Sequence, residues 1–450
     1  MSRMFGTDGV RGVANTELTA ELAMDLGKAA ALVLAKDSAR PLIVIGRDTR
    51  GSGEMLEEAL TAGILSAGGD VIKAGIIPTP GIAFLTQAYE ASAGVVISAS
   101  HNPFQFNGIK FFNAKGFKLD DALEDEIEAK IREGITVVAE GGEIGRILQP
   151  SEDPVKKYGD FVRSTFEGSL KGVRIVLDCA HGASSVVAPD VFAGLGAEVL
   201  TVGCAPDGLN INEACGSTHP EQLAAAVVRE NADVGLAFDG DADRLIAVDE
   251  KGHLIDGDRL ISIFEKYMKE QGTLAENRVT VTVMSNIGFH RRAEELGIDV
   301  DVTDVGDRYV LESMLKTGSV LGGEQSGHIL LLDYCTTGDG MLAGLQLLKA
   351  YRHYGIPLSE LAEEMKVYPQ VLNNAKVRNE NKDLWKEDQE IMAAIAEAEE
   401  KVTSGGRGGR VLIRKSGTEP LVRVMIEGED KAEIEPIARD LAELIERKLS

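Results

Sequence analysis

Three aspartates at alternate positions could bind a metal ion. Asp239, Asp241 and Asp243 lie in the segment Asp-Gly-Asp-Ala-Asp-Arg, directly after the apolar residues 234–238. Three carboxylates in one tight loop can bind a single hard divalent cation, which prefers oxygen ligands. Without a cation, the crowding of three negative charges is unfavourable. The spacing therefore predicts a Mg²⁺ site in a loop between two strands.

Three other interpretations of this acidic loop are considered. A calcium-binding EF-hand would use the three aspartates and end at Glu250, but Arg244 stands where that loop needs glycine. A solvated acidic turn needs no metal. An aspartyl-phosphate phosphatase of the haloacid-dehalogenase type would use Asp239 as its nucleophile, although such enzymes favour threonine or valine at the position of Asp243.

A second loop combines hydroxyl groups with an imidazole. Ser98-Ala99-Ser100-His101-Asn102-Pro103 follows the apolar run 93–97, which is typical of a buried strand. Pro103 fixes its own φ and biases the preceding residue away from helix, so we expect a bent loop. Such loops at the carboxyl ends of strands often carry chemistry. The spacing does not distinguish Ser98 from Ser100, and an ordinary polar turn is the alternative.

Two further segments carry side chains suited to sugars and phosphates. Residues 322–328, Gly-Gly-Glu-Gln-Ser-Gly-His, offer donors and acceptors for sugar hydroxyls, with a plain glycine turn as the alternative. Residues 414–420, Arg-Lys-Ser-Gly-Thr-Glu-Pro, with Arg423 beyond them, combine cations, hydroxyls and backbone N–H groups. Such a combination suits a phosphate, although a charged β-hairpin turn has the same composition.

The distribution of charge favours an anionic substrate. The net charge of −25 argues against nucleic acid or an anionic membrane as the main partner, because both require a basic surface. Cations nevertheless lie in or beside glycine-rich loops, namely Arg11, Arg47, Arg50, Lys110, Arg244, Arg308, Arg414, Lys415 and Arg423. A phosphate-bearing substrate would require such local positive charge.

Apolar strands followed by polar turns and helices recur along the chain. Strands expected at 42–45, 173–177 and 279–283 each begin this pattern, which is typical of mixed or mostly parallel α/β domains. We expect three similar α/β domains, a linker at 367–370, and a smaller C-terminal α+β domain with a helix at 383–402. The expected domain limits are 1–153, 154–252, 253–366 and 371–450.

The composition favours a cytoplasmic protein. No apolar run is long enough to cross a membrane, and the first residues lack the apolar core of a signal peptide. The four cysteines have no CxxC spacing, which is consistent with reduced thiols. The sequence is compatible with a homodimer.

In combination, these motifs resemble the α-D-phosphohexomutase family. The chain begins with Phe5-Gly6-Thr7-Asp8-Gly9-Val10-Arg11-Gly12, and the serine loop, the acidic loop, residues 322–328 and residues 414–420 follow in the family's order. The resemblance covers essentially the whole chain and implies four domains. The opening motif, Ser-Ala-Ser-His-Asn-Pro and Gly-Gly-Glu-Gln-Ser-Gly-His-Ile are most similar to bacterial members that act on glucosamine phosphates.

The resemblance implies roles for individual residues. Ser100 would be a phosphoserine that carries the transferable phosphate, and with Asp239, Asp241 and Asp243 it would hold one Mg²⁺. A sugar bisphosphate, or phosphoserine already in place, would activate the enzyme. The other expected site residues are Arg11, Lys110, Arg244 and His328 in the cleft, Glu324 and Ser326 at the sugar hydroxyls, and Arg414, Ser416, Gly417, Thr418 and Arg423 at the non-reacting phosphate.

The implied reaction interconverts glucosamine 6-phosphate and glucosamine 1-phosphate. Phosphoserine would donate its phosphate, and the resulting bisphosphate would turn around and return its other phosphate to Ser100. Lys110 and His328 are the candidates for general acid/base work. The reaction would supply amino-sugar nucleotides and cell-wall precursors. A phosphomannomutase or phosphoglucomutase of the same family is the alternative.

Two residues depart from the family's pattern. Phe106 stands where relatives often have an acidic residue, and Ala242 replaces a frequent glycine in the acidic loop. Alanine there requires either a negative φ or some backbone strain. Because the phosphate-binding segment follows a linker, the last domain is also predicted to move as the cleft opens and closes.

Overall fold

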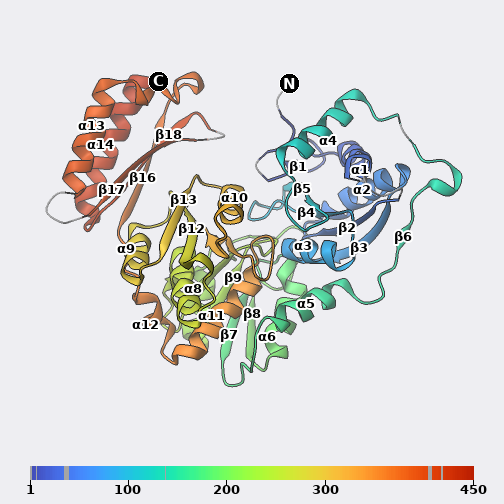
Figure 1. Ribbon diagram of the computed structural model, residues 1–450, viewed down its shortest axis with the longest axis horizontal. Coiled ribbons are helices and arrows are strands. Elements are labelled where there is room, and N and C mark those ends of the chain that lie inside the picture. Colours follow the sequence, from blue (N-terminus) through green and yellow to red (C-terminus); the bar gives the residue numbers. More distant parts are fainter. Residues whose placement is uncertain (1–2, 7, 35–39, 137, 404–407, 417–418) are drawn as a thin grey trace. The chain divides into compact units, whose positions relative to one another are not determined.

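The protein divides into two compact units (Figure 1). The structure is a computed structural model that describes residues 3–6, 8–34, 40–136, 138–403, 408–416 and 419–450. The larger unit comprises residues 1–284 and 298–363, and the smaller unit comprises residues 285–297 and 364–450. The larger unit contains three sheets and the smaller unit contains one.

The first sheet of the larger unit has six strands. The elements of this region are β1 (Val10–Val13), α1 (Ala20–Leu34), β2 (Leu42–Arg47), α2 (Gly53–Ser66), β3 (Asp70–Ile76), α3 (Thr79–Ala88), β4 (Ala93–Ile97), β5 (Phe106–Asn113), α4 (Asp121–Glu133) and β6 (Ile147–Leu148). The strand order is β1-β5-β4-β2-β3-β6. β5 runs antiparallel to β1 and β4, while the remaining neighbours are parallel. α1, α2 and α4 cover one face, and α3 covers the other (Figure 1).

The second sheet has five strands. Its region contains α5 (Pro154–Ser164), β7 (Arg174–Asp178), α6 (Ala188–Gly194), β8 (Glu198–Val202), α7 (Glu221–Glu230), β9 (Val234–Phe238), β10 (Leu245–Asp249), β11 (Leu254–Ile255) and α8 (Gly257–Gln271). The strand order is β11-β10-β9-β7-β8, with parallel pairs on β7 and antiparallel pairs on β10. β9 and β10 form a hairpin, so the acidic loop lies between two paired strands.

The third sheet has four strands. Its region contains β12 (Arg278–Thr282), β13 (Asp299–Thr303), α10 (Asp307–Thr317), β14 (Leu321–Gly323), β15 (Ile329–Leu331), α11 (Gly340–Tyr354) and α12 (Leu358–Glu363). The order is β13-β12-β14-β15, in which only β15 is antiparallel to its neighbour. The three mixed sheets agree with the fold class predicted from the sequence.

The smaller unit is built on a three-stranded antiparallel sheet. Its elements are α9 (Ile287–Leu296), β16 (Gln370–Lys376), α13 (Gln389–Thr403), β17 (Arg410–Lys415), β18 (Leu421–Glu427) and α14 (Lys431–Leu449). β18 lies between β16 and β17. Short 3₁₀ turns occur in both units, at Gly141–Glu143, Ala183–Val186, Ala275–Asn277, Asn379–Asn381 and Leu384–Lys386.

Two details of the smaller unit differ from the sequence prediction. Strand β16 begins at Gln370, at the end of the expected linker. The helix expected at 383–402 begins only at Gln389, because the Asp388 carboxylate accepts hydrogen bonds from the backbone N–H groups of Glu390 and Ile391. An acidic side chain that satisfies the first N–H groups is a typical helix start.

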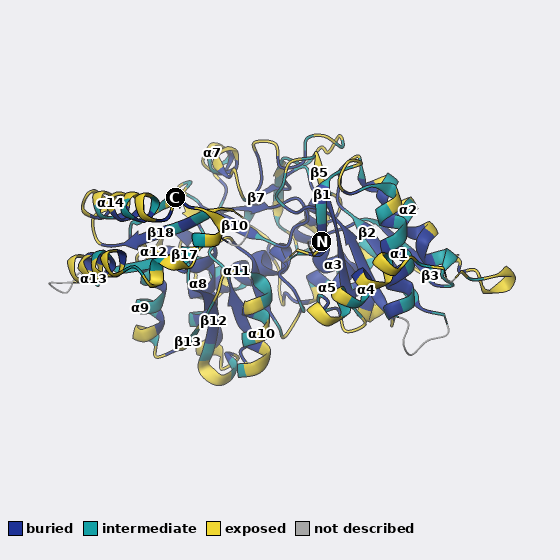
Figure 2. Ribbon diagram, turned by 90° about the horizontal axis from the view of Figure 1, so that it is seen from above, coloured by how far each residue is buried: buried dark blue, intermediate teal, exposed yellow. Residues whose placement is uncertain are grey.

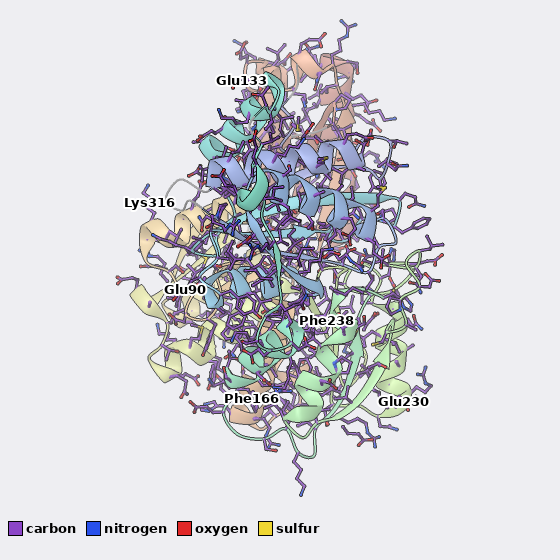
Figure 3. All side chains as sticks on the ribbon, turned by 90° about the vertical axis from the view of Figure 1, so that its right-hand side faces the viewer. Glu90, Glu133, Phe166, Glu230, Phe238 and Lys316 are labelled. Atoms are coloured by element: carbon purple, nitrogen blue, oxygen red, sulfur yellow. The ribbon has the colours of Figure 1, made fainter. Side chains whose placement is uncertain are left out.

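Apolar side chains of the inner strands and helix faces form the cores, whereas outer helix faces are exposed (Figure 2). Phe238, at the end of β9, is fully buried and lies in the packed interior, while Lys316 on α10 lies at the periphery (Figure 3). Among the described residues, no helix is both long and apolar enough to cross a membrane. The buried strand ends thus provide a rigid base for the polar loops that follow them.

One buried carboxyl group makes the stability of the larger unit depend on pH. Asp339 caps α11 by accepting a hydrogen bond of 3.0 Å from the backbone N–H of Leu342, and the Tyr158 hydroxyl donates another of 2.8 Å. Burial raises the pKa of Asp339 to about 6. Because the folded state then binds a proton that the unfolded state has released, stability is lost as pH rises from about 4 to about 6.

Asp339→Asn should remove this pH-dependent loss. The free energy of unfolding of the variant, relative to the wild type, is expected to rise by up to about 3 kcal/mol between pH 4 and pH 6 and to stay constant above that range. Chemical unfolding of both proteins at several pH values measures this difference. Parallel pH profiles for the two proteins would show that the carboxyl group has an ordinary pKa.

Candidate functional site

The serine loop after β4 separates the roles of its two serines. The Ser98 hydroxyl donates to Asp48 Oδ2 at 2.6 Å and accepts the backbone N–H of Ser100 at 3.0 Å. Ser100 has a left-handed φ of 51°, an uncommon conformation that turns its side chain out of the strand direction. Its hydroxyl donates to Asp239 Oδ2 at 2.6 Å. Ser98 therefore positions the loop, and Ser100 faces the acidic loop.

A buried guanidinium holds the serine loop in place. Arg50 pairs with Asp48 at 2.9 Å, and both side chains are fully buried. The guanidinium also donates to four backbone carbonyls, those of Ser100, Asn102, Pro103 and Phe106. Saturated in this way, Arg50 cannot bind a substrate phosphate. Arg50, one of the cations in the glycine-rich loops, therefore supports the serine loop instead.

Arg47 and Arg308 are also engaged by carboxylates of the protein. Arg47 pairs with Glu54 at 3.0 Å and with Glu57 at 3.5 Å, both on α2. Arg308 donates to Asp121 at 2.6 Å and to Glu312 at 2.9 Å. Arg47 thus braces β2 against a helix, while Arg308 also lines the cleft described below.

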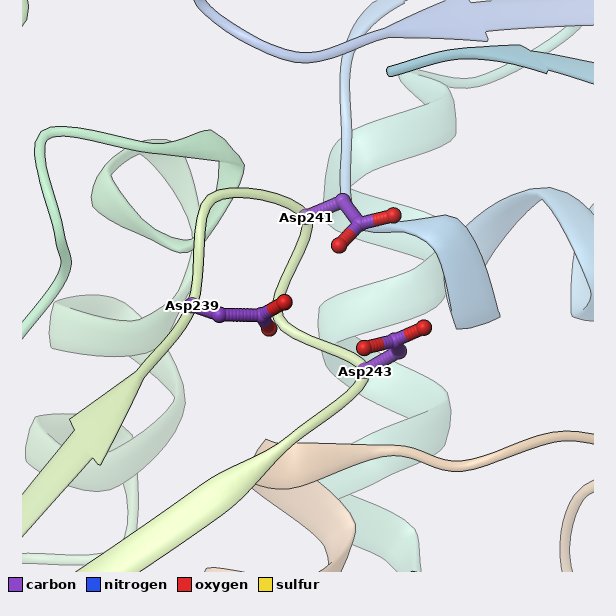
Figure 4. Close-up of side chains that lie close together, drawn as sticks. All are labelled: Asp239, Asp241 and Asp243. Atoms are coloured by element: carbon purple, nitrogen blue, oxygen red, sulfur yellow. The ribbon is translucent and has the colours of Figure 1, made fainter. Parts of the chain in front are cut away.

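The three aspartates of the acidic loop converge (Figure 4). Asp239, Asp241 and Asp243 are buried, and each contributes one oxygen to a cluster whose members lie within 4.8 Å of one another. Asp241 Oδ1 and Asp243 Oδ1 are buried and accept no hydrogen bond from any described residue. Buried carboxylate oxygens that accept no hydrogen bond are costly, so the arrangement fits a cation that is bound by oxygen ligands alone.

Electrostatics within the acidic loop support this interpretation. Burial, together with the charges of Asp243 and Asp241, raises the pKa of Asp239 well above its usual range. A divalent cation would reverse this effect by favouring the ionised form.

Ala242, between two of the ligands, has a φ of 55°. Alanine therefore adopts the strained conformation that a glycine would adopt freely.

The EF-hand alternative is wrong. Strand β10 begins at Leu245, so a calcium loop cannot continue through these residues. Glu250, which would supply the last ligand, instead accepts hydrogen bonds from the backbone N–H of Ser359 and from its hydroxyl.

Lys110 contacts the acidic loop through Asp241. Its ammonium is buried and lies 3.0 Å from both Asp241 Oδ2 and Asp8 Oδ2. Burial lowers the pKa of Lys110, but Asp241 and Asp8 outweigh burial and raise it above the ordinary value. The Thr79 hydroxyl also donates to Asp241 Oδ2, at 2.6 Å. One carboxylate oxygen thus receives two donors, which fixes its orientation.

His328 approaches the acidic loop from another side. Its Nδ1 lies 3.6 Å from Asp243 Oδ2, and its Nε2 lies 3.7 Å from Asp307 Oδ2. Burial lowers the pKa of His328, but the charges of Asp243 and Asp307 outweigh it and raise the pKa. The ring therefore retains its second proton to a higher pH than an ordinary histidine does.

A cleft of about 400 Å³ opens beside Ser100. Of the predicted site residues, it is lined by Ser100, Arg11, Asp243, Arg244, Glu324 and His328. Lys110 and Ser326 do not line this cleft. The Ser326 hydroxyl lies 3.4 Å from Glu324 Oε2, to which it donates, and Glu324 Oε1 accepts the backbone N–H of Gly306 at 3.0 Å.

Arg244 and Arg11 contribute positive potential beside Ser100. Burial, followed by the charges of Arg244 and Arg11, lowers the pKa of His101 to about 4. His101 Nδ1 lies 3.4 Å from Ser100 Oγ. The histidine is therefore neutral at physiological pH, and the two arginines supply positive charge where a phosphate on Ser100 would lie.

The smaller unit carries the predicted phosphate-binding segment. Strands β17 and β18 are neighbours, and their register places Arg414 directly opposite Arg423. Two arginines therefore occupy adjacent positions of the sheet. Arg423 donates to Glu419 at 3.0 Å. The Lys382 ammonium donates to the carbonyls of Ser416 and Glu419, both at 3.0 Å, which braces the turn. Lys415 pairs with Asp383 on the surface. Gly417 and Thr418 lie outside the described residues.

Comparisons with known proteins agree with this geometry. Models of the phosphoglucomutase/phosphomannomutase family match α/β/α domain I at residues 2–137, domain II at 156–252, domain III at 256–368 and the C-terminal domain at 372–444. The chain belongs to this family.

Individual relatives of the phosphoglucomutase/phosphomannomutase family align over the full length. The phosphoglucosamine mutase of Clostridium novyi (strain NT) is 55% identical over 450 residues, covering 100% of this chain and 99% of that protein. A solved family member from Burkholderia thailandensis has a TM-score of 0.83 at 23% identity, with 100% and 99% coverage. The Aspergillus fumigatus N-acetylphosphoglucosamine mutase in complex with GlcNAc-6P and magnesium has a TM-score of 0.70 at 16% identity, with 99% and 96% coverage. These two structures share the fold.

Sequence reasoning about this family member missed several residues that position the site. Asp8 lies inside the opening motif, from which the sequence predicted only Arg11 as a site residue. Thr79, between two prolines at the start of α3, carries no local pattern that marks it as a site residue. Asn212 donates to the carbonyls of Ser100 and Asn102 at 2.9 and 3.0 Å, and no local pattern marks it.

Proposed function

We propose that the protein interconverts glucosamine 6-phosphate and glucosamine 1-phosphate, with Ser100 carrying the phosphate between the two sugar positions. The observation that carries the proposal is the 2.6 Å hydrogen bond from Ser100 Oγ to Asp239, within a buried acidic triad. Full-length relatives named phosphoglucosamine mutase support the choice of an amino sugar. The alternative sugars are glucose and mannose phosphates.

The acidic triad and Ser100 would hold one Mg²⁺. All of the ligand atoms are oxygens, which suits Mg²⁺ better than zinc or copper. When bound, the ion would stabilise negative charge on the phosphoryl group during its transfer. The presence of magnesium in the Aspergillus fumigatus enzyme is consistent with this assignment.

The reaction exchanges one phosphate ester for another. The bond between Ser100 Oγ and phosphorus breaks as the free hydroxyl oxygen of the sugar phosphate bonds to the same phosphorus. The hydroxyl proton is taken up by the protein, and Ser100 Oγ regains a proton. The bisphosphate then turns around, and its other phosphate returns to Ser100 by the reverse exchange. The protein must therefore bind the sugar in two opposite orientations.

Lys110 and His328 are the candidates for moving these protons. The pKa of each group is raised by neighbouring carboxylates, against the effect of burial. Each therefore stays protonated to a higher pH than usual, and the raised pKa also makes each group a weaker acid. By microscopic reversibility, a group that donates a proton in one step accepts one in the opposite step.

Other residues would bind the parts of the sugar that do not react. Glu324 and Ser326 offer oxygens and a hydroxyl for the sugar hydroxyls, and Arg11 and Arg244 add positive charge. The segment with Arg414, Ser416, Gly417, Thr418 and Arg423 would bind the second phosphate. We further propose domain limits of 1–153, 154–252, 253–366 and 371–450, and a cytoplasmic location.

The sugar preference is tested by steady-state kinetics with Mg²⁺ and a catalytic amount of sugar bisphosphate. The kcat/KM for glucosamine 1-phosphate is expected to exceed those for glucose 1-phosphate and mannose 1-phosphate by at least about 10-fold. The reason is that sugars without the amino group leave the polar groups that would bind it unpaired. Faster turnover of glucose or mannose phosphate would contradict the sugar assignment, while leaving the family unchanged.

A further inference from the structure

A single lysine joins two distant segments of the larger unit beside the cleft. Lys118 lies between β5 and α4, and its Nζ donates to Asp8 Oδ1 at 2.6 Å and to Asp307 Oδ2 at 2.5 Å. Asp307 is the first residue of α10. The three residues are far apart in sequence, so this bridge exists only in the folded protein. It has no role in the function proposed above.

The first carboxylate of the bridge leads to the base of the active site. Asp8 Oδ2 lies 3.0 Å from Lys110 Nζ, and Asp8 also pairs with Arg11. Lys110 in turn lies 3.0 Å from Asp241, one of the three aspartates of the acidic loop. The orientation of Asp8 therefore determines where both cations lie.

The second carboxylate leads to the residues that face the sugar. Asp307 Oδ2 lies 3.7 Å from His328 Nε2, whose other ring nitrogen lies 3.6 Å from Asp243. The residue before it, Gly306, donates its backbone N–H to Glu324 at 3.0 Å. Any shift at the start of α10 is thus transmitted to His328 and to Glu324.

The contacts form a chain of alternating charges that starts and ends on the acidic loop. From Asp241 it passes through Lys110, Asp8, Lys118, Asp307 and His328 to Asp243. Networks of hydrogen bonds and close charge contacts act as units when each member orients the next. Lys118 is the central link of this chain.

Lys118 and both of its carboxylates form part of a wall. Asp8, Lys118, Asp307 and His328 line both the cleft beside Ser100 and a second cavity of about 290 Å³. The second cavity is lined both by apolar side chains, including Phe111, Phe117, Leu119, Leu311, Leu315 and Leu330, and by polar and charged ones, among them Lys110, Glu124 and Arg308. The bridge therefore lies between two cavities, and its loss would allow the groups on the cleft side to shift.

We propose that Lys118 and Asp307 are positioning residues, whose ion pair holds Lys110, His328 and Glu324 in the geometry needed for phosphate transfer. The proposal rests on the mutase function proposed above and adds two residues to its machinery. Lys118 acts through Asp8 and Asp307 rather than by binding the substrate phosphate, because two carboxylates already occupy its ammonium group. Loss of Lys118 should therefore lower kcat and leave KM nearly unchanged.

Lys118→Met tests the proposal because it removes the charge and keeps a long side chain. In the full-length enzyme with Mg²⁺, kcat is expected to fall by about 10- to 100-fold, the loss typical of residues that orient active-site groups. KM for the sugar phosphate is expected to change by less than about 3-fold. Lys118→Arg retains the two-carboxylate bridge and should recover most of kcat. Asp307→Asn should resemble Lys118→Met, and the double variant should be no slower than the slower single variant.

Lys73→Met is the matched control, because it also removes a lysine ion pair. Lys73 on β3 pairs with Glu58 on α2 at 2.7 Å, and neither residue lines the cleft beside Ser100. This variant should have an unchanged kcat. A Lys118→Met enzyme with wild-type kcat, a raised KM with unchanged kcat, or multiplied losses in the double variant would each overturn the proposal. If Lys118→Met does not fold, Asp307→Asn carries the same kcat prediction. An inactive wild type would instead contradict the mutase function itself.

Discussion

Ser100→Ala is expected to abolish phosphate transfer. The variant lacks the hydroxyl that would carry the phosphate, so kcat should fall by on the order of 10⁴-fold or more, as it does when a covalent nucleophile is removed. The fold should remain, because the loop is held by Arg50 and Asn212 through backbone carbonyls rather than through the Ser100 side chain. Steady-state assays with both glucosamine phosphates, combined with thermal unfolding, measure the two effects.

Ser98→Ala provides the control for this variant. It removes the hydrogen bonds to Asp48 and from the Ser100 N–H, so activity should fall while the enzyme still takes up phosphate from a sugar bisphosphate. Intact-mass measurements before and after incubation with the bisphosphate distinguish the variants. A Ser100→Ala enzyme that gains a phosphate group, or that retains substantial mutase activity, would exclude Ser100 as the carrier.

Asp241→Asn is expected to remove metal-dependent activity. Asp241 would supply one of three ionised ligands, and the bound ion is expected to stabilise the transition state by several kcal/mol. The rate should therefore fall by about 100-fold or more, as should that of the wild type after chelation of divalent ions. Mg²⁺ should raise the thermal midpoint of the wild type, because it binds the folded state, and should not raise that of the variant.

Asp249→Asn is the matched control for the loss of a buried carboxylate. Asp249 is buried at the end of β10 and accepts backbone N–H groups of Lys251 and His253, which an asparagine oxygen can also accept. This variant should retain the Mg²⁺-dependent rise in thermal midpoint. An equal rise in Asp241→Asn would show that the ion binds elsewhere, and full activity after chelation would contradict the requirement for a metal.

The acidic loop could be predicted because its signal is local. Three aspartates at alternate positions between two apolar segments converge whenever those segments pair as a hairpin, and β9 and β10 do so. The repeated strand–turn–helix pattern similarly predicted three mixed sheets. Strand β16 was missed because Asn373 and Asn374 interrupt its apolar pattern, and its pairing with β18 is formed with residues about fifty positions away.

The functions of the basic residues could not be predicted in the same way. Arg50 lies in a glycine-rich loop as a phosphate ligand would, but its guanidinium is occupied by Asp48, by three carbonyls of the serine loop and by the carbonyl of Phe106. The choice between Ser98 and Ser100 likewise depends on Asp48 and Asp239, which other strands supply. Long-range contacts of this kind leave no trace in local spacing.

Mapping the site of phosphate uptake identifies the residue that carries the phosphate. The enzyme is incubated with Mg²⁺ and glucosamine bisphosphate labelled in its phosphate groups, digested, and the labelled peptide is sequenced. We expect one labelled residue, Ser100, in the peptide that contains Ser98–Pro103, and transfer of that label to glucosamine 6-phosphate when this sugar is added later. Label on Asp239, released as free phosphate rather than transferred to the sugar, would contradict the account and indicate an aspartyl-phosphate phosphatase instead.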